Sequence, residues 1–130
     1  LSTFFTDLTH GFNCSYKLEN AAHQYALVMD LVNHYRTVLD IKYKAVKYED
    51  IVADQENKTK ELLEFIGVDW DDSCLNFHNN TRYARTASYA QVSEKMYTSS
   101  VFRYKNYRKQ IEPIIPILEP HIKNLGYTIE

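Results

Sequence analysis

Residues 18–48 read LENAAHQYALVMDLVNHYRTVLDIKYKAVKY, and their pattern gives the clearest indication of the fold class. Within 18–39, apolar side chains recur at helical spacing with no glycine or proline among them, which predicts one long helix. Residues 43–48 alternate at period two and are rich in aromatic and β-branched side chains, which predicts a short strand. A strand needs partners in a sheet. We therefore expect a mostly α-helical chain with one or two short strands, completed by a larger α/β unit or by another copy.

Outward from this stretch, turn and capping residues mark the other elements. Asp54 is placed to cap a second helix that runs to about Ile66, where Gly67 ends it. Shorter elements are predicted at residues 1–9 (the end of a helix), at 71–77 (a short helical turn), from Ser99 or Ser100 to Ile111 (a third helix) and from Pro120 onward (a last short helix). Residues 78–98 read as irregular.

The bulk composition excludes several classes of protein. The chain has 130 residues, 45% of them hydrophobic, and a net charge of −2, which fits a packed domain or part of one and gives no support for nucleic-acid binding. No apolar stretch is long enough to span a bilayer, and Leu1–Phe5 lacks the basic flank of a signal peptide, so we expect a cytoplasmic protein. A start at Leu1 rather than Met suggests an excerpt of a longer chain.

Histidine and cysteine spacing gives no indication of a metal. The five histidines show no ligand spacing, and the two cysteines, Cys14 and Cys74, are expected to be reduced thiols. We therefore expect no metal cofactor.

Hydrogen-bond donors concentrate in the irregular stretch and just after it. Arg85, Thr86 and Ser88 come first, and Tyr97-Thr98-Ser99-Ser100 follows directly before the predicted third helix. The N-terminus of a helix is an anion site, where serine hydroxyls and an arginine could hold a phosphate. The alternative is that Ser99 or Ser100 is only an N-cap.

Tyr48-Glu49-Asp50 ends the predicted strand. Ligands of open α/β sheets bind outside such strand ends, so Tyr48 is a candidate contact for a nucleotide base. Two alternatives stay open: Tyr48 is a core residue, or the two carboxylates do acid–base or metal chemistry.

In order along the chain, these segments resemble the sulfotransferase family, in particular the bacterial sulfotransferase domains fused to tetratricopeptide repeats. The matching segments are KYEDIVAD (47–54), LLEFIGVDW (62–70), CLNFH (74–78), RTASYAQV (85–92) and YTSSVFRYKNY (97–107). The resemblance implies a P-loop-like α/β fold and the donor 3'-phosphoadenosine 5'-phosphosulfate. It also implies that residues 1–130 form the C-terminal portion of one domain, with the phosphosulfate loop and the catalytic base lying before residue 1.

Residue by residue, the resemblance assigns donor contacts. Ser2 matches the serine that binds the 3'-phosphate, Tyr48 the tyrosine that contacts adenine, and Thr86 lies in the stretch that lines adenine. Residues 97–100 match the loop that closes on the 3'-phosphate. The pattern departs at Phe102, where the bacterial domains usually carry glycine, so the phenyl ring could crowd the phosphate.

Three functional hypotheses follow. In the first, this chain supplies adenine and 3'-phosphate contacts to a sulfotransferase but transfers no sulfate alone. The acceptor is then a carbohydrate, a peptide or a small molecule. In the second, the chain is a non-catalytic helical module that self-associates through its exposed apolar surface and strand edge. In the third, it binds an unrelated nucleotide phosphate.

Overall fold

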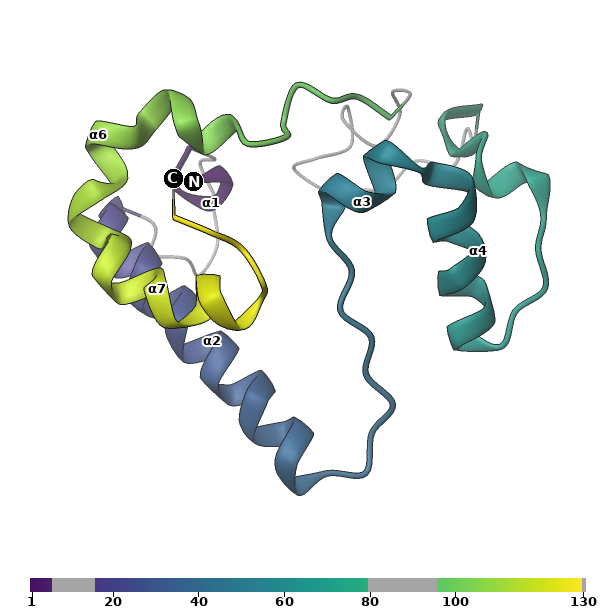
Figure 1. Cartoon of the computed structure of the whole chain (residues 1–130), viewed down its shortest axis with the longest axis horizontal. Helices are drawn as coiled ribbons and strands as arrows, with labels where there is room; N and C mark the ends of the chain where they lie inside the picture. The colour runs from purple at the N-terminus through teal and green to yellow at the C-terminus, as the bar shows by residue number, and fades with distance from the viewer. Residues whose placement is uncertain (6–15, 80–95, 130) are drawn as a thin grey trace. The chain divides into compact units, whose positions relative to one another are not determined.

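The structure is a computed structural model that describes residues 1–5, 16–79 and 96–129. The chain divides into two compact units (Figure 1). The first unit comprises Leu1–Tyr43 and Tyr104–Glu130, and the second comprises Lys44–Arg103. All regular structure in the described ranges is helical, which agrees with the prediction of a mostly α-helical chain but not with its short strands.

In the first unit, the predicted long helix is confirmed as α2, Leu18–Val38. It packs against α7, Ile115–Asn124, and the short helix α1, Ser2–Phe5, also contacts it (Figure 1). The chain enters α7 through η4 (Arg103–Tyr107), α6 (Arg108–Ile111) and η5 (Glu112–Ile114).

The core of the first unit lies between α2 and the C-terminal helices. Ala22, Ile111 and Ile114 are its buried apolar residues. Partly buried side chains surround them: Leu18, Tyr104, Tyr107, Ile117 and Leu118. Because Leu18, Ala22 and Tyr25 recur at spacings of four and three, one face of α2 is turned toward this core.

The C-terminal helices begin at other places than the sequence predicted. Residues 99–102 form turns, and helical structure starts only at Arg103, so the predicted start at Ser99 or Ser100 is wrong, whereas the predicted end at Ile111 agrees with α6. The last helix starts at Ile115, with Pro116 in its first turn, whereas Pro120 lies inside it. Burial of this helix's apolar face against α2 offsets the hydrogen bond that an internal proline removes.

In the second unit, α3 (Tyr48–Ala53) is followed by α4 (Gln55–Ile66), and the 3-10 turns η2 (Asp72–Cys74) and η3 (Phe77–Asn79) come next. The cap of α4 is as predicted: Asp54 accepts a bond from the Asn57 amide at 3.4 Å. The predicted end is also confirmed, because Gly67 has φ 74° and the Val68 amide donates to the Leu63 carbonyl at 2.9 Å.

The predicted strand is not formed within the described ranges. Residues 40–47 are neither helix nor strand, although Lys47 keeps an extended backbone with φ −89° and ψ 132°. Tyr48, predicted to end the strand, instead begins α3. An extended segment becomes a strand only when a neighbour accepts and donates its main-chain hydrogen bonds, and no such neighbour is found in the described part of this chain.

Candidate functional site

Tyr48 lies where the extended segment turns into α3. Glu49 and Asp50 follow in the first helical turn, where carboxylates favour the positive end of the helix dipole. The phenolic hydroxyl of Tyr48 donates a hydrogen bond to the main-chain carbonyl of Tyr97, at 2.6 Å. These residues are 49 positions apart. The fold of the second unit therefore brings together two of the segments that sequence analysis selected.

The Tyr48 phenol is held in its protonated form. Loss of solvent around the hydroxyl raises the pKa of Tyr48, and electrostatic interactions with Tyr97 and Glu49 raise it further. A phenol is already protonated at neutral pH, so a raised pKa keeps it a hydrogen-bond donor.

The segment that Tyr48 contacts forms two consecutive turns. The Val101 amide donates to the Thr98 carbonyl at 2.9 Å, and the Arg103 amide donates to the Ser100 carbonyl at 3.3 Å. Thr98, Ser99 and Ser100 are exposed, so three neighbouring hydroxyl groups are accessible to solvent. An exposed run of hydroxyls on a turn can donate to phosphate oxygens.

This geometry corrects the predicted anion site. The sequence placed Ser99 and Ser100 at the N-terminus of a helix, whose dipole would attract a phosphate. In the structure Phe102 has a positive φ of 52°, and a right-handed helix cannot continue through that conformation. Residues 98–100 thus offer exposed hydroxyl donors but no α-helix dipole.

Phe102 is the position at which the resemblance drawn from the sequence led us to expect glycine. Its left-handed conformation costs a bulky L-residue about 1–2 kcal/mol, whereas glycine adopts it freely. The departure from the pattern therefore concerns the backbone as well as the size of the side chain.

A lysine–glutamate cluster ties the extended segment to α4. Lys44 Nζ donates to the main-chain carbonyl of Glu61 at 3.1 Å and lies 3.6 Å from its carboxylate. Lys58 pairs with the same carboxylate at 2.6 Å. The hydrogen bond from Lys58 is the largest cause that holds the pKa of Glu61 below its usual range. Sequence analysis missed this cluster because Lys44 and Glu61 share no local pattern.

The remaining predicted site residues are placed as follows. Ser2 is the first residue of α1 and is exposed. Arg85, Thr86 and Ser88 lie outside the described residues. Within 1–5, 16–79 and 96–129, no group of three or more histidine, cysteine, aspartate and glutamate side chains is placed to hold a metal ion.

Two histidines have buried ring atoms. His121 of α7 is 7% exposed, meets the Tyr25 ring edge-on and lies 3.9 Å from the Asp30 carboxylate. His78 has a buried Nδ1 with no hydrogen-bond partner in the structure. In the first unit, Arg36, His121 and Lys123 all lie in last helical turns, where cations favour the negative end of the dipole.

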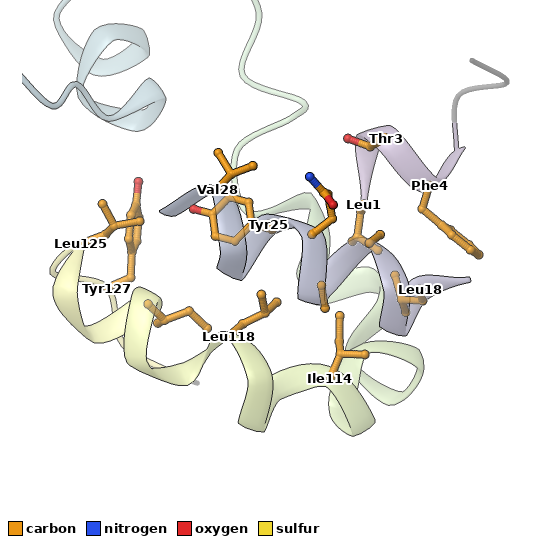
Figure 2. Close-up of a pocket in the computed structure, with 14 residues that line it drawn as sticks. Leu1, Thr3, Phe4, Leu18, Tyr25, Val28, Ile114, Leu118, Leu125 and Tyr127 are labelled. Carbon is orange, nitrogen blue, oxygen red and sulfur yellow. The ribbon is translucent and has the colours of Figure 1, made fainter. Parts of the chain in front are cut away.

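The first unit also contains an apolar hollow of about 460 Å³, which lies beside α2 and α7 (Figure 2). Leu18, Tyr25 and Val28 of α2 line it together with Ile114, Leu118, Leu125 and Tyr127 (Figure 2). Desolvation raises the pKa of Tyr25. None of the lining residues has a charged side chain, so the hollow suits apolar groups and is a poor place for a doubly charged phosphate.

None of the helices in the described ranges combines the length and the apolar character that crossing a bilayer requires.

Comparison with known proteins identifies the family. The model of the sulfotransferase family matches residues 1–72, which is more than half of the 130 residues. An uncharacterized protein of Aquifex aeolicus (strain VF5) is 30% identical over 95 residues, and the match covers 73% of this chain but 12% of that protein. No solved structure matches. On the family match, this chain belongs to the sulfotransferase family.

Proposed function

We propose that this chain supplies the adenine and 3'-phosphate contacts of a sulfotransferase whose donor is 3'-phosphoadenosine 5'-phosphosulfate. The observation that carries the proposal is the hydrogen bond from the Tyr48 hydroxyl to the Tyr97 carbonyl. It joins the candidate adenine contact to the turn that carries Thr98, Ser99 and Ser100, so one ligand could reach both segments.

The residues of this site fit the donor's nucleoside end. The Tyr48 side chain is 38% exposed, which leaves ring surface on which a base could stack. The exposed hydroxyls of residues 98–100 could donate to the 3'-phosphate. Ser2, Arg85, Thr86 and Ser88 belong to the same proposal through their match to the family pattern.

In the proposed reaction, an acceptor hydroxyl or amine attacks sulfur in line and forms the new S–O or S–N bond. The bond from sulfur to the 5'-phosphate oxygen breaks, and adenosine 3',5'-bisphosphate leaves with that electron pair. The acceptor proton passes to a base supplied by the rest of the domain. Positioning and charge stabilisation provide most of the rate, as in phosphoryl transfer.

We place this chain in the C-terminal portion of the domain, of the kind fused to tetratricopeptide repeats in bacteria. The three glycines of the sequence stand apart and match no glycine-rich phosphate-loop motif. We therefore expect these 130 residues alone to transfer no sulfate. An assay with labelled donor and a panel of carbohydrate, peptide and small-molecule acceptors tests this expectation, and any turnover would contradict it.

Calorimetric titration with adenosine 3',5'-bisphosphate tests the proposal. Binding to the wild-type chain, weakened in Ser99→Ala and in Arg85→Ala, would support it. Ser73→Ala is a matched control, because Ser73 lies in η2 and belongs to no candidate site. Equal binding of adenosine 5'-monophosphate would favour an unrelated nucleotide binder, and no binding at all would refute the proposal.

A second candidate function, self-association, is favoured by the exposed apolar residues of α2. Leu27, Leu31 and Val38 are 64%, 47% and 57% exposed. Light scattering separates the two candidates: a stable dimer that binds no nucleotide would favour the oligomerisation module.

A further inference from the structure

We infer that the Tyr48 hydroxyl is a positioning group. It holds in place the segment 97–101, which is proposed to contact the 3'-phosphate, in addition to any contact of the Tyr48 ring with the base. This inference rests on the proposed function for the ligand but on the structure alone for the contact. The two parts of the Tyr48 side chain then have different roles: the ring can stack on adenine, and the hydroxyl donates a hydrogen bond to the Tyr97 carbonyl at 2.6 Å.

The first step of the argument is the geometry of one peptide unit. The Tyr97 carbonyl and the Thr98 amide belong to the same plane, and this peptide bond is trans. Fixing the direction of the carbonyl therefore fixes the Thr98 N–H, which points away from the Tyr48 hydroxyl. A hydrogen bond accepted by the carbonyl also polarises the N–H of that unit and makes it a better donor.

The second step is the conformation of the residues that follow. The turn closed by the hydrogen bond from Val101 to Thr98 leads into the turn closed by the bond from Arg103 to Ser100, and this second turn contains Phe102 at φ 52°. A bulky residue keeps a left-handed conformation only where its surroundings enforce it. The Tyr48 bond anchors the start of this segment to α3, and the turn bonds then determine the path of residues 98–103.

The third step is what each part of Tyr48 should contribute. If the hydroxyl positions the turn, its removal weakens contacts to the 3'-phosphate and leaves stacking of the base intact. If the hydroxyl instead bonds the base, its removal weakens every adenine nucleotide alike.

The experiment is calorimetric titration of Tyr48→Phe with adenosine 3',5'-bisphosphate and with adenosine 5'-monophosphate. We expect the affinity for the bisphosphate to fall about fivefold, the effect of one neutral hydrogen bond, while the affinity for the monophosphate is unchanged. Tyr16→Phe is the matched control, because the Tyr16 side chain is 73% exposed and lies in no candidate site. An equal loss for both nucleotides, or no loss for either, would overturn the inference.

A second measurement needs no ligand. In the free protein, Tyr48→Phe should accelerate amide hydrogen exchange at Val101 and Arg103 about fivefold, since both amides close the turns that the hydroxyl anchors. Unchanged exchange at these two amides overturns the inference. If the wild-type chain binds neither nucleotide, the proposed function fails, and the exchange rates alone decide whether Tyr48 positions the turn.

Discussion

In the first unit, Ala22, Ile111 and Ile114 are buried between α2 and the C-terminal helices, whereas none of the described residues of the second unit is buried. In the described part of the second unit, segments distant in the sequence are joined by polar contacts such as those of Tyr48 with Tyr97 and of Lys44 with Glu61. Apolar burial stabilises by several kcal/mol for each large side chain, and exposed polar pairs contribute about 1 kcal/mol or less. The first unit should therefore be the more stable of the two.

This difference bears on function, because the described candidate donor contacts other than Ser2 lie in the second unit. Ligand-binding segments are commonly drawn from the parts of a protein that have few buried apolar contacts. A nucleotide that binds at Tyr48 and residues 97–100 would add contacts to the unit that has few buried apolar contacts. Such binding would stabilise the folded second unit by mass action.

The largest expected effect comes from truncating the core of the first unit. Ile114→Ala removes a side chain that is 8% exposed and should lower the free energy of unfolding by about 3 kcal/mol. Urea unfolding followed by far-UV circular dichroism measures the change, with Ile41→Ala as control, since Ile41 is 50% exposed.

Trp70 adds a second probe to this experiment. It is the one tryptophan of the sequence and lies in the second unit, so its fluorescence reports on that unit. We expect Ile114→Ala to move the dichroism transition more than the fluorescence transition. Coincident shifts would show that the two units unfold together and do not differ in stability.

A smaller effect is expected at the end of α4 in the second unit. Gly67 has φ 74°, and a Cβ placed there meets no atom within 4 Å, so backbone strain alone opposes a side chain. Gly67→Ala should therefore destabilise the second unit by about 1 kcal/mol, seen as an earlier Trp70 fluorescence transition. Gly67→Asn should destabilise the second unit less than Gly67→Ala does, because asparagine tolerates the left-handed region. An alanine variant as stable as wild type would contradict this account.

The smallest expected effect is the pH response of η2. Hydrogen bonds from the Ser73 hydroxyl and then from its amide hold the pKa of Asp71 below its ordinary value. A carboxylate with a lowered folded-state pKa stabilises above its unfolded pKa, and this contribution is lost as the pH falls through the folded value. NMR titration should give a low midpoint for Asp71, and Ser73→Ala should raise it. An unchanged midpoint in the variant would rule out this cause.

Predictions from the sequence succeeded where the determining interactions are local. Apolar spacing was enough to predict α2 and α4, and the residue types at Asp54 and Gly67 were enough to predict where α4 is capped and where it ends. Predictions failed where distant contacts decide. The segment 43–48 has strand composition but no strand neighbour, and Ser99-Ser100 has capping composition but is followed by a left-handed Phe102.

The candidate site shows the same limit. Tyr48 and residues 97–100 were selected from the sequence through family resemblance and donor content, but their contact was not foreseen as a bond from phenol to carbonyl. The Lys44–Glu61–Lys58 cluster was not foreseen either, because its members join an extended segment to a helix without any shared spacing.

The amino-acid sequence was therefore enough for α2, for α4 with its cap and end, and for membership of the sulfotransferase family. These depend on interactions within a few residues or on the order of motifs along the chain. Only the tertiary structure decided that the Tyr48 hydroxyl meets the Tyr97 carbonyl and that Phe102 is left-handed. Such features depend on the path of the chain between distant segments, which no local preference specifies.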